Sequence, residues 1–431
     1  MKFSKPNNIY ILISISILII LFSLSFSIMY PKLETSNINS FDNQNNLNLN
    51  DLTGINNTHI LLGSSSALSG HAGFLGTETI KGSKIYFNEI NNNGGIYGRK
   101  IKLISYDDQY DPSKTVPNTI KLINDDKVFA LFDFVGTPTS VKILDIIKQS
   151  KTPAVGFFTG ANELRNPVNP FLFNIRDSYN SEAEAAIFYF VDKLRYDKVA
   201  IFYQDDAFGK TVLKDTISAL KKRKLKPVII DKFTRGTMDI QTAQKNIQNS
   251  NAQAVIMVGT YSPLAKFIKI STDNNFTPYF HTVSFIGSGA FSNEIINVQK
   301  IDKKYYDKIL VTQVVPSPFD NSSDLVKEYR TLLKKYYPNS TVNYVSFEGF
   351  INAKVLVEAL NLVGEDLTKT KLITSLESMH EYGIGFDEKI NFHKFDHQAI
   401  DEVYYSKLTN NSKFEIFNPF ILNNSSSINI D

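Results

Sequence analysis

Short apolar runs alternate with longer stretches of helical periodicity from about residue 59 to residue 408. The first apolar run, residues 59–63, is followed by small residues and by an apolar stripe at helical spacing over residues 80–90. Strands separated by helical segments predict parallel sheets, and roughly ten strands require two of them. We expect further strands at 101–106, 128–132, 153–158, 199–203, 228–230, 254–258 and 309–312, and helices at 138–149, 185–194, 207–222, 239–248, 264–272, 324–336 and 347–362.

Acidic residues follow the predicted strands at two similar places. Tyr106-Asp107-Asp108-Gln109-Tyr110 ends one strand, and Tyr203-Gln204-Asp205-Asp206-Ala207 ends another. Asp206 is expected to cap the helix at 207–222, as Asp111 with Pro112 is expected to begin a helix. The carboxyl ends of parallel strands are where open α/β sheets bind ligands.

The sharpest local feature is Gly136-Thr137-Pro138-Thr139-Ser140, between a strand and a helix. Thr137 fits the N-cap, and free N–H groups with the hydroxyls of Thr139 and Ser140 suit an anion such as a ligand carboxylate. Phe158-Thr159-Gly160 repeats this arrangement one strand later. The alternative is an ordinary cap that serves only its helix.

The amino terminus carries an export signal or an anchor. Lys2 and Lys5 precede residues 9–30, an uncharged run long enough to span a bilayer at about 20 residues. We expect residues 1–30 to be a signal peptide or N-terminal membrane anchor and residues 31–57 to be a disordered linker. The chain contains no cysteine, which excludes disulfides, thiolate metal sites and a lipid-modified cysteine.

Composition and motifs point away from catalysis. The 46 basic residues nearly balance the 43 acidic ones, so no global field favours nucleic acid. Nucleotide-binding, serine-hydrolase and zinc-protease motifs are missing from the sequence. His393 and His397 stand in a turn-like region, where a solvated or capping role is weighed against a metal site. The aspartates at 107, 108, 205 and 206 are weighed as general acids or bases against caps.

Several motifs, in this order and spacing, resemble the type I periplasmic solute-binding proteins of the leucine/isoleucine/valine-binding kind, which serve ABC importers. The matching pieces are Leu68-Ser69-Gly70, Gly94-Gly95-Ile96-Tyr97-Gly98-Arg99, Tyr106-Asp107-Asp108, Val135 to Ser140, Tyr203 to Gly209, Val311 to Pro316 and Tyr344 to Phe350. The resemblance implies an α/β fold with two Rossmann-like lobes, parallel sheets flanked by helices, joined by three crossovers near 175–178, 313–316 and 385–391. Lobe 1 would hold residues 58–177 and 316–388, lobe 2 residues 178–315 and 389–420, and residues 421–431 a tail.

The resemblance also implies a small-molecule ligand held between two closing lobes, with no metal, cofactor or catalytic residue. The binding residues it implies, together with aromatic residues on neighbouring loops, are Ser69, Phe74, Gly136, Thr137, Thr139, Ser140, Phe158, Thr159, Gly160, Asp206, Phe208, Tyr261 and Phe285. Amino-acid binders of this family carry an acid for the ligand ammonium in the loop that aligns with residues 281–287, and none occurs here. Unless Asp205 or Asp206 substitutes, this favours a carboxylate without an amine, or an amide.

Two other functions remain open from the sequence. A membrane-tethered ligand-sensing ectodomain with a separate signalling partner would use the same lobes, and a hydrolase would use the cleft aspartates. For the leading function we expect a location in the periplasm or at the outer face of the inner membrane, with an ABC importer as the partner.

Overall fold

The first sheet consists of five parallel strands in the order β2-β1-β3-β4-β5. The computed structural model describes residues 49–420. The strand predicted at 153–158 is only two residues long, because Gly156 takes a positive φ of 74° and turns the chain away. The strands are β1 (His59–Ser66), β2 (Lys100–Asp107), β3 (Ala130–Phe132), β4 (Ala154–Val155) and β5 (Leu172–Phe173).

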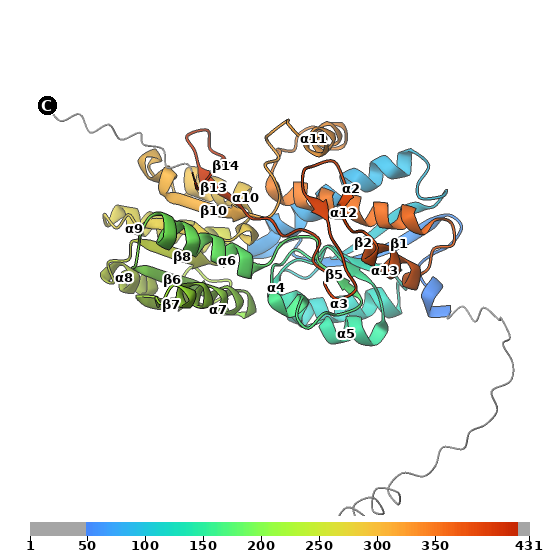
Figure 1. The fold of residues 1–431 in the computed structure, drawn as a ribbon, viewed down its shortest axis with the longest axis horizontal. Coiled ribbons are helices and arrows are strands. Elements are labelled where there is room, and N and C mark those ends of the chain that lie inside the picture. The colour runs from blue at the N-terminus through green and yellow to red at the C-terminus, as the bar shows by residue number, and fades with distance from the viewer. Residues whose placement is uncertain (1–48, 421–431) are drawn as a thin grey trace, which may run out of the picture. The chain divides into compact units, whose positions relative to one another are not determined.

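Helices α2 and α12 lie against each other beside this sheet (Figure 1). Two glycines allow this close approach: a Cβ on Gly82 would lie 1.9 Å from the carbonyl oxygen of Ser346, and one on Gly349 would lie 2.1 Å from that of Thr79. The helices grouped with the first sheet are α2 (Gly73–Asn92), α3 (Pro112–Asn124), α4 (Thr137–Val141), α5 (Leu144–Ser150), α11 (Asp324–Tyr336), α12 (Tyr344–Val363) and α13 (Lys369–Glu377).

The second sheet has seven strands in the order β14-β13-β10-β9-β8-β6-β7, of which β13 and β14 run antiparallel to their neighbours. The strands are β6 (Val199–Gln204), β7 (Ile229–Phe233), β8 (Ala254–Val258), β9 (Tyr279–Thr282), β10 (Ile309–Gln313), β13 (Tyr404–Leu408) and β14 (Phe414–Ile416). Its helices are α6 (Tyr179–Ile187), α7 (Ala207–Lys222), α8 (Gln241–Asn249), α9 (Tyr261–Asp273) and α10 (Ser288–Asn293). The mixed α/β class with helix-flanked parallel sheets is confirmed.

Local signals at helix starts were mostly correct. Asp206 caps α7 by accepting from the Gly209 N–H, and Asp111 caps α3 by accepting from the Ser113 N–H. The helix predicted at 138–149 is instead two short helices, α4 and α5. Thr137 is the first residue of α4 and Gly136 is its N-cap, so the prediction of a Thr137 cap was wrong.

The third connection between the sheets lies later than the predicted 385–391. Residues 382–390 form a small antiparallel pair, β11 (Tyr382–Gly383) with β12 (Lys389–Ile390). Beyond it the rings of Phe392 and His397 still pack on Phe173 of β5, at 5.3 and 4.0 Å between centroids. The chain joins the second sheet only at β13.

The end of the predicted linker is folded rather than disordered. Residues 49–52 form a short 3-10 helix, and Gly54 accepts a backbone hydrogen bond from Leu61. The rest of the linker, the apolar segment 9–30 and the tail 421–431 lie outside the described residues. No helix within residues 49–420 has the length and apolar character needed to cross a membrane.

Candidate functional site

The loops that follow β3 and β4 meet through a pair of threonine hydroxyls. Thr137 Oγ1 and Thr159 Oγ1 are 2.7 Å apart, and both side chains are fully buried. Burial raises the pKa of the neighbouring Tyr179, and the positive charge of Arg176 and the two threonine hydroxyls act against that rise. The two hydroxyl loops singled out in the sequence therefore form one polar spot at the carboxyl ends of adjacent strands.

The anion-binding argument for the first loop is weaker than the sequence suggested. The helix α4 has five residues, so few aligned peptide dipoles add up at its start. Thr139 Oγ1 donates to the carbonyl oxygens of Val135 and Gly136, at 2.6 and 2.9 Å, and is not free for a ligand. The buried Ser140 Oγ has no hydrogen-bond partner in the described part of the chain. Gly136 takes a φ of 102° and packs against the Tyr110 ring.

Aromatic rings from both sheets meet beside the two threonines. Phe285, from the short turn after β9, lies 5.8 Å from Phe158, 4.6 Å from Phe208 and 5.8 Å from Tyr110, measured between ring centroids. Phe208 also lies 5.3 Å from Tyr179. All five side chains are at most 1% exposed, so loops of both sheets are held together by an apolar core. Gly160 lies against Tyr179, where a Cβ would sit 2.6 Å from the Tyr179 nitrogen.

A buried arginine connects this aromatic group to acids of both lobes. Arg176 lies on the connection after β5, and its guanidinium is 4.8 Å from the Phe158 ring. Its nitrogens lie 3.6 Å from Glu182 Oε1 and 3.5 Å from Glu348 Oε1, and the arginine side chain is 0% exposed. Burial raises the pKa of Glu348 to about 7 despite the positive charge of Arg176. The Nε and Nη1 atoms of Arg176 have no hydrogen-bond acceptor within residues 49–420.

Glu182 supplies an acid to the very loop in which the sequence has none. Its carboxylate accepts hydrogen bonds from the Ser284 N–H and hydroxyl, at 2.7 and 2.8 Å, and from Thr312 Oγ1 at 2.7 Å. Sequence reasoning missed Arg176, Glu182 and Glu348. The sequence did contain a signal. Each of these charged residues lies close to apolar residues that were expected to be buried, and a charged side chain is rarely buried unless it is paired.

Three of the four aspartates weighed as acids or bases are already engaged within the protein. Asp206 holds the α7 cap and accepts from Gln204 Nε2 at 2.6 Å, while burial raises its pKa. Asp205 pairs with Lys210 and Lys232 at 3.0 and 2.7 Å. Neither acid is therefore free to take over a ligand ammonium. Asp107 accepts from the exposed Ser69, which lies away from the threonine pair.

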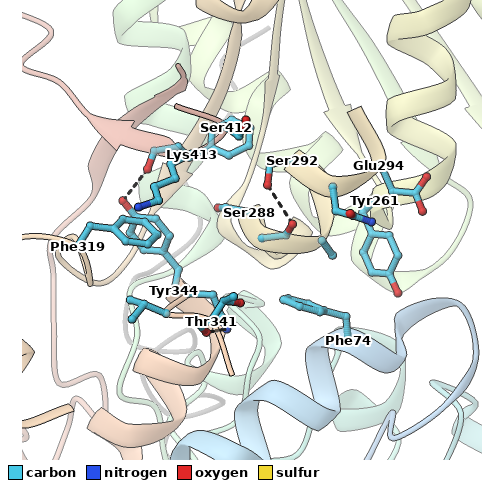
Figure 2. A pocket seen from close by; sticks show the side chains of 16 residues that line it. Phe74, Tyr261, Ser288, Ser292, Glu294, Phe319, Thr341, Tyr344, Ser412 and Lys413 are labelled. Atoms are coloured by element: carbon cyan, nitrogen blue, oxygen red, sulfur yellow. Dashed lines mark hydrogen bonds between the residues drawn. The ribbon is translucent and has the colours of Figure 1, made fainter. Parts of the chain in front are cut away.

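Phe74 and Tyr261 line a cavity whose lining does not include the threonine pair. Their rings are 6.4 Å apart, edge to face, at the side of a cavity of about 510 Å³. Figure 2 shows this cavity, which we call the outer cavity. It is lined by Phe74, Tyr261, Ser288, Gly289, Ala290, Ser292, Asn293, Glu294, Phe319, Thr341, Val342, Asn343, Tyr344, Ser412, Lys413 and Phe414.

The two C-terminal histidines serve packing. His397 stacks on Phe173 at 4.0 Å and hydrogen-bonds the Leu172 carbonyl through Nδ1 at 3.0 Å. His393 instead faces the ring of His380. No cluster of three or more potential metal ligands occurs in the described chain.

Comparisons with known proteins agree with this architecture. The family model described as periplasmic binding protein matches residues 59–413. Leu/Ile/Val-binding protein homolog 7 of Brucella abortus is 24% identical over 354 residues, which cover 76% of this chain and 85% of that protein. The crystal structure of a possible leucine/isoleucine/valine-binding protein from Rhodopirellula baltica has 30% identity and a TM-score of 0.79, covering 86% of this chain and 99% of that one.

A fatty acid ABC transporter substrate-binding protein from Thermomonospora curvata shares the fold, with a TM-score of 0.76 at 19% identity over 85% of this chain and 93% of that one. The match of the family model to most of the folded chain decides the assignment. The chain belongs to the periplasmic binding protein family, as a type I member of the Leu/Ile/Val-binding group of solute-binding proteins.

Proposed function

We propose that this protein captures a small carboxylate-bearing or amino-acid-like ligand between two closing lobes outside the cytoplasm and delivers it to an ABC importer. The observation that carries the proposal is the meeting of the Thr137 and Thr159 loops with Phe208 and Phe285 of the other lobe. Residues of both lobes at one buried place are what ligand capture by hinge closure needs.

The ligand's anionic group would be held by the threonine hydroxyls and by the guanidinium of Arg176. Arg176 Nε is a buried donor without an acceptor within residues 49–420, and Nη1 has only the Glu348 carboxylate at 3.5 Å, so both donors could still gain from an acceptor on the ligand. A carboxylate is the usual partner of a guanidinium because it accepts two parallel hydrogen bonds. The Brucella relative is named for leucine, isoleucine and valine, which carry this group, and the Thermomonospora protein for fatty acids, which also do.

A ligand without an amine suits the acids better than an α-amino acid. Glu182 and Glu348 share the single positive charge of Arg176, and the Glu182 carboxylate already accepts three hydrogen bonds from Ser284 and Thr312. Asp205 and Asp206 are held by lysines and by the α7 cap. An ammonium would have to displace one of these pairings, and a buried ammonium without a counter-charge is unfavourable.

The double variant Thr137→Val/Thr159→Val tests the proposal. It keeps the side-chain shapes and removes both partners of the hydroxyl–hydroxyl bond, but it also leaves the Ala161 N–H without Thr159 Oγ1, its acceptor at 3.3 Å, so a stability loss of about 1 to 3 kcal/mol is expected. Affinity for the ligand released from natively purified protein, identified by mass spectrometry and titrated calorimetrically, should fall at least about tenfold, which corresponds to about 1.4 kcal/mol.

Thr119→Val is the matched control. Thr119 is equally buried but donates to the Thr115 carbonyl within α3, away from the threonine pair. Equal affinity in the double variant and in the control would remove the two loops from the site.

A further inference from the structure

We propose that closing of the two lobes is coupled to the binding of one proton by Glu348, so that acidic conditions favour the closed lobes. This inference rests on the lobe closure of the proposed function and adds a control over it. Glu348 lies on α12, beside the first sheet, and belongs to the buried charged group around Arg176. Glu182, the other acid of that group, lies on α6, beside the second sheet.

The structure shows the two lobes in contact. The loop after β7 reaches the loop after β2, where Arg235 Nη1 donates to the Tyr110 carbonyl oxygen at 3.2 Å. The rings of Phe158 and Phe285, which come from opposite lobes, lie 5.8 Å apart. The surroundings of Glu348 in this structure are therefore those of the closed lobes.

The carboxylate of Glu348 is buried with little compensation for a negative charge. The residue is 3% exposed, and its Oε1 atom has no hydrogen-bond donor within residues 49–420. Arg176 lies 3.5 Å from this atom, but it also serves Glu182 at 3.6 Å, so two carboxylates share one guanidinium. A buried carboxylate without a donor is unfavourable when it is ionised, and a bound proton removes its charge.

Two further charged groups face Glu348, and both belong to the lobe of the first sheet. Arg165 favours the ionised form of Glu348 only weakly, and its guanidinium already donates to backbone carbonyl oxygens at 2.9 to 3.4 Å. Asp133 accepts from Ser83 and Asn352. Burial raises the pKa of Asp133, and the charge of Glu348 raises it further. Neither group supplies the counter-charge that Glu348 lacks.

Opening of the lobes should release the proton. Burial raises the pKa of Glu348 to about 7, while the charge of Arg176 acts against this rise and that of Glu182 adds to it. Arg176 donates to Ser284, and Glu182 accepts from the same serine, so both charges stay with the second sheet when the lobes part. Their opposite effects on Glu348 are then lost together. Water that reaches Glu348 reverses the larger effect of burial, and the pKa returns toward its ordinary value of 4.5.

Single-molecule FRET on the full chain tests this coupling without a ligand. The sequence has no cysteine, so dyes can be attached at Ile120→Cys in α3 and Lys245→Cys in α8, one exposed position in each lobe. As the pH falls from 8 to 5.5, the ratio of closed to open molecules should rise at least about threefold in total, and by at most about tenfold for each pH unit below 7. Glu348→Gln keeps the shape of the side chain but cannot titrate, so its ratio should not vary with pH.

Lys369→Gln is the matched control. Burial lowers the pKa of Lys369 to about 8, so this group also titrates near neutral pH. It is the first residue of α13 and lies near Asp51 of the short 3-10 helix, within the lobe of the first sheet. Its FRET response to pH should therefore equal that of the wild type.

Three results would each overturn the proton coupling: a ratio that is independent of pH in the wild type, a response that persists in Glu348→Gln, and loss of the response in Lys369→Gln. None of them would contradict ligand capture, because that proposal is tested by the affinity of the threonine variants. Equal ligand affinity in those variants would in turn leave the FRET result unchanged.

Discussion

Replacing Arg176 with methionine should destabilise the fold strongly, because it leaves two buried acids without their counter-charge. The guanidinium lies 3.6 Å from Glu182 and 3.5 Å from Glu348, and the side chains of these three residues are 0, 0 and 5% exposed. Removing one partner of a buried ion pair lowers the free energy of unfolding by about 3 to 5 kcal/mol. Methionine keeps the unbranched apolar stem but is shorter than arginine, so the space left by the guanidinium adds to the loss.

The assay is urea unfolding at pH 8, followed by circular dichroism, with Arg223→Met as the matched control. Arg223 also pairs with two acids, at the shorter distance of 2.7 Å to both Glu184 and Asp192, but these carboxylates are 34 and 36% exposed. Exposed pairs contribute about 0 to 1 kcal/mol. A loss below about 1 kcal/mol in Arg176→Met, or an equal loss in both variants, would refute the reasoning that burial, not distance, sets the size of the effect.

Three further predictions concern pH, packing and capping. The folded-state pKa of Glu348, about 7, lies above its ordinary value of 4.5, so the native state binds more protons than the unfolded state between these two pH values. The wild type should therefore lose up to about 3 kcal/mol of stability as the pH rises from 4.5 to 7. Glu348→Gln should flatten that pH profile, and an unchanged profile would assign the loss to other groups. Gly82→Ala should lower the free energy of unfolding in urea by about 1 to 3 kcal/mol, because its Cβ would lie 1.9 Å from the Ser346 carbonyl oxygen. Gly73→Ala, in the same helix with only ordinary contacts at 3.7 Å, should stay near the wild type. Equal free energies of unfolding in the two variants would contradict this account of the α2 and α12 contact. Asp206→Ala should cost about 0.5 to 2 kcal/mol in the same assay through loss of the α7 cap, whereas Asp206→Asn should retain most of it.

The fold was predictable from the sequence because its local signals agree with one another. The start of α7 at Ala207 follows from Asp206, and the strand at 254–258 follows from an apolar run of five residues. Where the prediction was wrong, a single backbone position decided the outcome. Gly156 ends β4 after two residues, and Gly136, not Thr137, caps α4. Positive φ angles at these glycines depend on tertiary packing that periodicity does not reveal.

The candidate site was only partly predictable, since a motif shows which residues are polar and not which partners they have. The hydroxyl loops at Thr137 and Thr159 were predicted to bind together, and the structure places their hydroxyls in contact. Phe74 and Tyr261, assigned to the same site, line a cavity whose lining does not include the two threonines. Arg176 and its acids went unnoticed, because the Arg176 to Glu348 pair joins segments more than a hundred residues apart, and Glu182, six residues after Arg176, lies at the start of another helix.

The most direct test of the central claim is a thermal-shift screen of the full chain against small carboxylates, amides and amino acids, run in parallel on Thr137→Val/Thr159→Val and Thr119→Val. The account predicts at least one compound that raises the melting temperature of the wild type and of Thr119→Val, and that has a much smaller effect on the double variant. A compound that stabilises all three proteins equally, or a panel in which no carboxylate has any effect, would contradict ligand capture at the threonine pair.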